Sequence, residues 1–185
     1  MTIAACNYAI LIGVNECIDQ QTFPRLRCAE NDVRALAETF TSPDFGLFTE
    51  PRIFTNQTSH QIRVDLTRIF KKAKSTDQIL IHYSGHGKVD TKNHLHLTTA
   101  DSEGDLLEAT SIPTKFISDL IDKSLCKRVV LILDCCYSGA IREAFRGDTI
   151  DNELQRLAEQ GKGIYILTAS TSTQPAREKN GDNYG

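Results

Sequence analysis

Five short apolar runs alternate with four amphipathic segments along this chain, and the alternation constrains the fold more than any other feature. The apolar runs have the length of buried strands, and the amphipathic segments carry apolar residues at helical spacing. Continuous apolar strands separated by helices predict an α/β domain with a mainly parallel central sheet and helices on both faces. The predicted strands are Tyr8–Val14, Arg52–Thr55, Gln78–Tyr83, Arg128–Leu133 and Gly163–Ala169, and the predicted helices are Cys28–Phe40, Ser59–Lys74, Pro113–Leu125 and Asp151–Glu159.

Size and charge exclude several classes of protein. A length of 185 residues suits one domain, and a net charge of -3 gives no reason to expect nucleic acid or an anionic membrane as partner. No apolar stretch approaches the roughly 20 residues that span a bilayer, and the N-terminus lacks the pattern of a secretory signal. The six cysteines form no CxxC pair, which argues against a zinc knuckle or a disulfide framework. We therefore expect a cytoplasmic protein with reduced thiols.

Two short motifs follow predicted strands. Cys136 lies in Asp134–Gly139 (DCCYSG) after the fourth strand, and His86 lies in Ser84–Gly87 (SGHG) after the third. We expect each motif to form a glycine-bounded turn. If the two strands are neighbours in a parallel sheet, both turns open at the edge where such sheets bind ligands. The alternative is that Cys136 is a small buried hydrophobe and that SGHG is only a tight turn.

A thiol and an imidazole are the two groups that a cysteine nucleophile and its base require. An unperturbed thiol is mostly protonated at neutral pH, so a nearby His86 would accept the proton and later donate one to a leaving amine. The backbone N–H groups of Gly87 and Cys136 are candidates for stabilising the oxyanion of an acyl-transfer intermediate.

These motifs resemble the catalytic blocks of the caspase-type cysteine peptidases. The similarity is closest to the metacaspase and prokaryotic orthocaspase branch. Tyr137 stands where many metacaspases have histidine, and this departure points towards the orthocaspase variety. The histidine of a caspase lies about 50 residues before its cysteine, and the same spacing separates His86 from Cys136. The resemblance extends from Tyr8 to about Glu178 and includes the segments 9–15 (AILIGVN) and 26–32 (LRCAEND).

The resemblance implies a three-layer caspase-like domain over residues 1–185. A large-subunit-like region would span about 8–141, a linker about 142–162, and the start of a small-subunit-like region about 163–185, where we expect the chain to be truncated. An enzyme that prefers basic residues would be able to cut itself in the linker, which contains Arg142, Arg146, Arg156 and Lys162. A solvated charged loop is the alternative interpretation of that segment.

The resemblance also assigns site residues. The nucleophile of the family precedes the aromatic position and Ser-Gly, which corresponds to Cys136 and leaves Cys135 as its inert neighbour; a reactive Cys135 is the alternative. Asp32 and Asp134 correspond to acids that line the first substrate pocket and select arginine or lysine, and Ser170 to a segment that binds extended peptides. Asp32 could instead serve only its helix N-terminus, and Asp134 only a polar strand end.

Calcium is the one metal that the resemblance suggests, because many metacaspases need it. Asp101 matches one acidic position of that site, and Glu108 and Glu143 stand near others. Carboxylates bind calcium, but scattered surface acids are common, so both interpretations stay open. His82 is expected to pack within its strand, and His94 and His96 to alternate in a small hairpin, which argues against zinc.

The sequence therefore predicts a cysteine endopeptidase that cleaves protein substrates after Arg or Lys through a Cys–His dyad. The hydrolysis needs no organic cofactor. The alternative is a caspase-like domain that has lost its chemistry and serves as an interaction scaffold, and a hydrolase of small amides is a third option. Peptide substrates, and a regulatory protein or domain, are the partners that the resemblance suggests.

Overall fold

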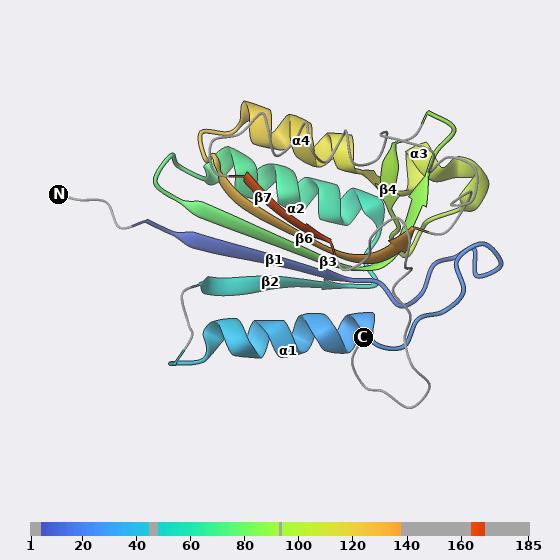
Figure 1. Ribbon diagram of the computed structural model, residues 1–185, viewed down its shortest axis with the longest axis horizontal. Coiled ribbons are helices and arrows are strands. Elements are labelled where there is room, and N and C mark those ends of the chain that lie inside the picture. Colours follow the sequence, from blue (N-terminus) through green and yellow to red (C-terminus); the bar gives the residue numbers. More distant parts are fainter. Residues whose placement is uncertain (1–4, 45–47, 93, 138–163, 169–185) are drawn as a thin grey trace.

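The structure is a computed structural model that describes residues 5–44, 48–92, 94–137 and 164–168 (Figure 1). These residues form one seven-stranded sheet with helices on both faces. The strands are β1 (Asn7–Gly13), β2 (Thr49–Thr55), β3 (Gln78–Val89), β4 (Leu95–Leu97), β5 (Ile112–Pro113), β6 (Arg128–Tyr137) and β7 (Ile164–Thr168). The helices are α1 (Ala29–Thr41), α2 (Ser59–Lys72), the 3₁₀ turn η1 (Gly104–Leu106), α3 (Leu107–Thr110) and α4 (Thr114–Lys123).

Five of the strands are parallel and lie in the order β2-β1-β3-β6-β7. The short strand β4 runs antiparallel to the end of β3, and β5 runs antiparallel to β4. Helix α1 covers one face of the sheet, and α2 and α4 cover the other (Figure 1). The predicted architecture of a mainly parallel sheet between two helical layers is confirmed.

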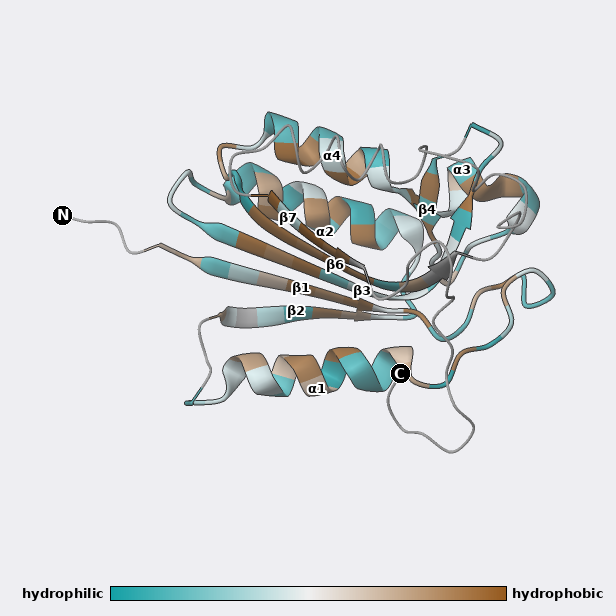
Figure 2. Cartoon of the chain, in the orientation of Figure 1, coloured by the Kyte–Doolittle hydropathy of each residue, from teal (hydrophilic) through white to brown (hydrophobic). Residues whose placement is uncertain are grey.

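Alternating side chains of the central strands build a separate core on each face of the sheet. In β3, Ile79, Ile81 and Tyr83 belong to the larger cluster with the apolar sides of α2 and α4. Leu80 lies on the opposite face, in the smaller cluster under α1. Figure 2 shows these middle strands as a continuous hydrophobic band. Both faces are buried, which explains why the strands have apolar rather than alternating sequences.

The predicted glycine-bounded turn at SGHG is wrong, because the motif continues its strand. Residues 134–137 of DCCYSG continue their strand as well, whereas Ser138 and Gly139 lie outside the described residues. β3 runs through SGHG to Val89, and β6 runs through the cysteine pair to Tyr137. The parallel ladder between residues 78–87 and 128–137 continues without a shift of register and overrides the low strand propensity of glycine. A Cβ at Gly85 would lie 2.5 Å from the Tyr83 hydroxyl, so the ring of Tyr83 requires glycine here.

The other predicted elements agree with the structure to within a few residues. The helix expected from Pro113 begins at Thr114, with Pro113 as its N-cap. The sequence patterns did not indicate β5, η1 or α3, which are only two to four residues long. The predicted helix Asp151–Glu159 lies outside the described residues. Within the described ranges, no helix combines the length and apolarity that crossing a membrane would take.

His82 is a buried histidine on the α1 face of β3, as expected, with 6% of its surface exposed. Its Nδ1 atom has no hydrogen-bond partner within the described residues. Burial lowers the pKa of His82 from 6.5 to about 4. The unfolded chain therefore binds a proton at His82 at a higher pH than the folded chain does. The contribution of neutral His82 to the free energy of unfolding is fully present above about pH 6.5 and is lost as the pH falls toward 4.

We expect His82 to lower the free energy of unfolding by about 2 kcal/mol between pH 7 and pH 5. His82→Leu should remove that part of the pH dependence, measured by urea unfolding at both pH values. Burial also lowers the pKa of His96, so some dependence should remain in the variant. His60→Leu, which replaces an exposed histidine, is the matched control and should keep the full dependence. Equal pH dependence in wild type and His82→Leu would contradict the assignment.

The start of α2 is fixed by a carboxylate from a distant loop. Asp101 accepts hydrogen bonds from the Ser59 N–H (2.7 Å), the Ser59 hydroxyl (2.9 Å) and the Thr99 hydroxyl (2.7 Å). Partial burial raises the pKa of Asp101, but these hydrogen bonds outweigh burial and hold the pKa below its ordinary value. The acid therefore stabilises the positive end of the helix and ties it to the loop after β4.

Asp101→Asn should lower the free energy of unfolding by about 1–2 kcal/mol, because it removes the charge that accepts these bonds. Urea unfolding at pH 7 in EDTA measures the loss without any contribution from a divalent cation. Glu103→Gln, which changes an exposed acid in the same loop, should be nearly neutral. If the two variants are equally stable, Asp101 does not act as a helix-capping acid.

Candidate functional site

The ladder between β3 and β6 brings the two predicted catalytic residues together. His86 and Cys136 are register partners in this parallel pair. Neighbouring strands lie about 4.8 Å apart, so the two backbone positions are adjacent across the sheet. The described side chains do not include that of Cys136, so its place in the site rests on the backbone register.

The neighbouring cysteine lies on the other face. Cys135 is 2% exposed and belongs to the larger core cluster under α2 and α4. Successive residues of a strand face opposite sides of a sheet, which assigns the Cys136 position to the α1 side together with His82, Ser84 and His86. A nucleophile must be accessible to substrate, so the burial of Cys135 argues against the alternative that it is the reactive thiol.

The ring of His86 is held by a backbone carbonyl from the loop between β1 and α1. Its Nε2 atom lies 2.6 Å from the carbonyl oxygen of Pro24. A carbonyl can only accept, so Nε2 must carry a proton and Nδ1 is left as the basic atom of the neutral ring. The buried ring of Phe23 lies beside the imidazole, with 6.0 Å between the ring centroids.

The backbone of His86 is fixed as well. Its carbonyl oxygen accepts a hydrogen bond from the Thr98 N–H at 3.0 Å and lies 2.7 Å from the Tyr83 hydroxyl. The same hydroxyl lies 2.9 Å from the carbonyl oxygen of Thr98. Tyr83 is fully buried, and burial raises its pKa well above the ordinary value. The phenol therefore stays protonated and links β3 to the residue that follows β4.

The loop that carries Pro24 is anchored by Asp19. The Asp19 carboxylate accepts hydrogen bonds from the backbone N–H groups of Thr22 and Gly104, each at 3.0 Å. Hydrogen bonds from Thr22 and Gly104 lower the pKa of Asp19 to about 2. A Cβ at Gly104 would lie 2.8 Å from the Thr22 side chain, so glycine allows the two loops to approach. Lys88 also holds this second loop by donating a hydrogen bond to the Gly104 carbonyl at 3.3 Å.

Asp32 and Asp134, the two predicted pocket acids, meet around Ser84. Ser84 is the register partner of Asp134 on β6 and of Gly13 on β1. Its hydroxyl donates a long hydrogen bond of 3.5 Å to the Asp32 carboxylate in the first turn of α1. A Cβ at Gly13 would lie 2.4 Å from the Ala29 carbonyl, so glycine lets the helix N-terminus approach the sheet. The position of Asp32 near the helix N-terminus is compatible with both roles considered for it.

The remaining predicted site residues are placed less completely. Gly87 is the register partner of both Leu97 on β4 and Tyr137 on β6, so its backbone lies between two strands. Its use as an oxyanion donor, together with the Cys136 N–H, stays a prediction. Ser170 and Glu143 lie outside the described residues.

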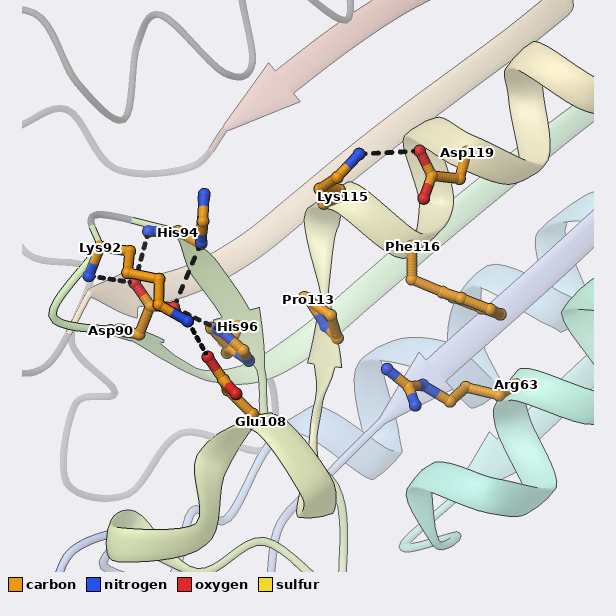
Figure 3. A pocket seen from close by; sticks show the side chains of 10 residues that line it. All are labelled: Arg63, Asp90, Lys92, His94, His96, Glu108, Pro113, Lys115, Phe116 and Asp119. Carbon is orange, nitrogen blue, oxygen red and sulfur yellow. Dashed lines mark hydrogen bonds and ion pairs between the residues drawn. The ribbon is translucent and has the colours of Figure 1, made fainter.

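The described acids of the predicted calcium site have other partners. Asp101 binds the start of α2, and Glu108 forms an exposed ion pair with Lys92 at 2.8 Å (Figure 3). Within the described ranges, no group of three or more His, Cys, Asp and Glu side chains is arranged to hold a metal ion. Because Glu143 lies outside these ranges, calcium binding stays a prediction. His96 lies within β4 and His94 directly before it, in the expected hairpin, and each has a ring nitrogen 3.3 Å from the Asp90 carboxylate.

Several residues that position the site were not predicted. They are Asp19, Pro24, Tyr83 and Ser84. An aspartate side chain can accept a hydrogen bond from the backbone N–H three residues on, as Asp19 does from Thr22, and this spacing could have indicated a rigid loop. The Pro24 carbonyl has no side-chain signature, because any residue supplies a carbonyl.

Comparisons with known proteins identify the family of the domain. Residues 6–183 match the family model for the caspase domain. The chain is 27% identical over 181 residues to metacaspase-7 of Arabidopsis thaliana, an alignment that covers 92% of this chain and 40% of that protein. It is 28% identical over 172 residues to metacaspase-4 of the same plant, with 83% of this chain and 37% of that protein covered.

The chain thus spans about two fifths of the length of these curated relatives. A crystal structure of a Geobacter sulfurreducens protein superposes with a TM-score of 0.67 at 16% identity, covering 97% of this chain and 77% of that one, and it supports the fold. The family model covers nearly the whole chain, across both the His86 and the Cys136 motifs. The chain therefore belongs to the caspase-domain family of cysteine peptidases.

Proposed function

We propose that this domain is a cysteine endopeptidase that cleaves peptide bonds after arginine or lysine. The observation that carries the proposal is the register pairing of His86 with Cys136 on adjacent parallel strands. The metacaspase names of the relatives support the class of reaction.

In the proposed reaction, His86 Nδ1 takes the proton of the Cys136 thiol, and the thiolate attacks the scissile carbonyl carbon. His86 then donates the proton to the leaving amine, and water hydrolyses the thioester with His86 again as base. The Pro24 carbonyl holds Nε2–H throughout, so Nδ1 faces the reaction in the correct tautomer. The N–H groups of Gly87 and Cys136 would stabilise the oxyanion.

The preference for a basic residue rests on Asp32 and Asp134. Ser84 lies beside both acids: its hydroxyl donates a hydrogen bond to Asp32 of α1, and its register partner on β6 is Asp134. Two carboxylates at the base of a substrate pocket would bind a guanidinium or ammonium group through charge-assisted hydrogen bonds. Cleavage within the chain after Arg142, Arg146, Arg156 or Lys162 is part of the same proposal, as is activation by calcium.

Fluorogenic peptides that differ only in the residue before the scissile bond test the proposal. We expect cleavage after Arg and Lys, and little or none after Asp or Gln. Cys136→Ala should lower kcat/KM by more than about a thousandfold, because it removes the nucleophile. Cys135→Ala, its matched control, should lose little catalysis. Asp32→Asn and Asp134→Asn should each lower the preference for Arg over Gln.

The outcomes separate the parts of the proposal. Full activity of Cys136→Ala would overturn the assignment of Cys136 as the nucleophile. A preference for Asp before the scissile bond would overturn only the proposal of an acidic substrate pocket. The scaffold alternative predicts no cleavage, with or without calcium, and alkylation of Cys136 by iodoacetamide no faster than that of Cys126. Cys126 is fully buried, and burial raises its pKa, which makes it an unreactive reference.

Asp19→Asn tests the role of the loop that holds the catalytic ring. The substitution weakens the hydrogen bonds that the Thr22 and Gly104 N–H groups donate to the Asp19 carboxylate. It should therefore let the Pro24 carbonyl move away from His86. We expect kcat to fall roughly 10- to 100-fold with little change in KM, because a small misplacement of a catalytic group strongly lowers the rate of the chemical step. The Asp105→Asn control, an exposed acid of η1, should be neutral. A change in KM alone, or an equal effect of both variants, would contradict this role.

A further inference from the structure

A pocket on the side of the sheet covered by α2 and α4 lies outside the proposed catalytic site. It has a volume of about 380 Å³ and lies between α2, α4 and the strands β4 and β5. Figure 3 shows Arg63 from α2 and Phe116 from α4 on one side of it, and Asp90, His94 and His96 on the other. The lining combines an aromatic ring and a proline with charged groups, as small-molecule and peptide sites do.

Most of the charges in this pocket are already paired with each other. Lys92 binds Glu108 at 2.8 Å, and Lys115 binds Asp119 at 2.9 Å. The Asp90 carboxylate lies 3.3 Å from a ring nitrogen of each neighbouring histidine and also accepts backbone hydrogen bonds. The acidic groups of the lining therefore have partners within the pocket.

Arg63 is the exception among the cationic residues that line the pocket. Its guanidinium carbon lies 4.9 Å from the centre of the Phe116 ring, and the described residues place no carboxylate in an ion pair with it. The buried Nε atom has no hydrogen-bond partner in this part of the chain. Stacking on an aromatic ring holds a guanidinium in place and leaves its N–H groups available in the plane. An arginine held in this way suits an external carboxylate.

We propose that this pocket binds a peptide segment in which a carboxylate lies next to an apolar side chain. The carboxylate would accept hydrogen bonds from Arg63, and the apolar side chain would contact Phe116 and Pro113. A single negative charge complements Arg63, which has no ion-pair partner among the residues that the structure describes. A dianionic phosphate fits less well, because Lys92 and Lys115 are paired with Glu108 and Asp119 and do not supply a second unpaired cation among the described lining residues.

Fluorescence polarisation with labelled peptides tests the proposal. The probes are eight-residue peptides with one Asp between Leu residues and an amidated C-terminus, and twins in which Asn replaces Asp. A second pair carries the carboxylate at the C-terminus, as a free acid or an amide. We expect the acids to bind, their amide twins to bind at least about tenfold more weakly, and added salt to weaken the binding.

Arg63→Gln should weaken binding of the acid probes about tenfold, because it keeps much of the side chain but removes the charge. Arg68→Gln is the matched control, since Arg68 lies on the same helix, is well exposed and forms only a long ion pair with Asp65. Phe116→Leu should also weaken binding by removing the ring under the guanidinium. Thermal unfolding of each variant checks that the domain is folded.

Binding of the internal-Asp probe identifies a side-chain carboxylate as ligand, and binding of the free-acid probe alone identifies a chain terminus; either supports the proposal. No binding of either acid, equal binding of acid and amide twins, or undiminished binding to folded Arg63→Gln would overturn it. The probes lack Arg and Lys, and the assay is done in the Cys136→Ala background. Its result is therefore independent of whether the domain is a peptidase.

Discussion

The parallel ladder between β3 and β6 is the constraint on which both the core and the candidate site depend. It pairs residues 78–87 with 128–137 without a shift of register. A slip of one residue would exchange the buried faces of these strands and expose Ile79, Ile81 and Tyr83 to the wrong helical layer. The same slip would separate His86 from Cys136. The hydrophobic core therefore specifies the alignment that the proposed chemistry needs.

The second requirement is the orientation of the imidazole, and a different part of the chain meets it. Phe23 is fully buried beside the His86 ring, while Asp19 ties its loop to Gly104. Apolar burial and main-chain hydrogen bonds thus bring the Pro24 carbonyl to Nε2. A carbonyl serves here as well as a carboxylate would for fixing the tautomer, because only a hydrogen-bond acceptor is needed. It places no additional negative charge beside the ring.

Sequence patterns predicted the layers, most of the element bounds and the two motifs at the sheet edge, because apolar periodicity and short motifs are local properties. They failed where tertiary pairing overrides local propensity. Ser84, Gly85 and Gly87 suggest a turn, yet the ladders to β6 and β4 extend them as strand. The Pro24 contact joins residues that are 62 positions apart. The acceptor is a backbone carbonyl oxygen, which every residue has, so no residue type in the sequence predicts the contact.

The two charged regions of the domain differ in what their surroundings supply. On the α1 side, Gly13 lets a helix N-terminus approach the sheet, so the positive end of the helix and the Ser84 hydroxyl both stabilise the charge of Asp32. On the opposite side, the acids that line the pocket pair with lysines and histidines, and Arg63 is stabilised by an aromatic face. The aromatic face stabilises Arg63 without neutralising its charge. A charge held in this way is preorganised for a ligand of opposite sign, which is the carboxylate that we propose for the pocket.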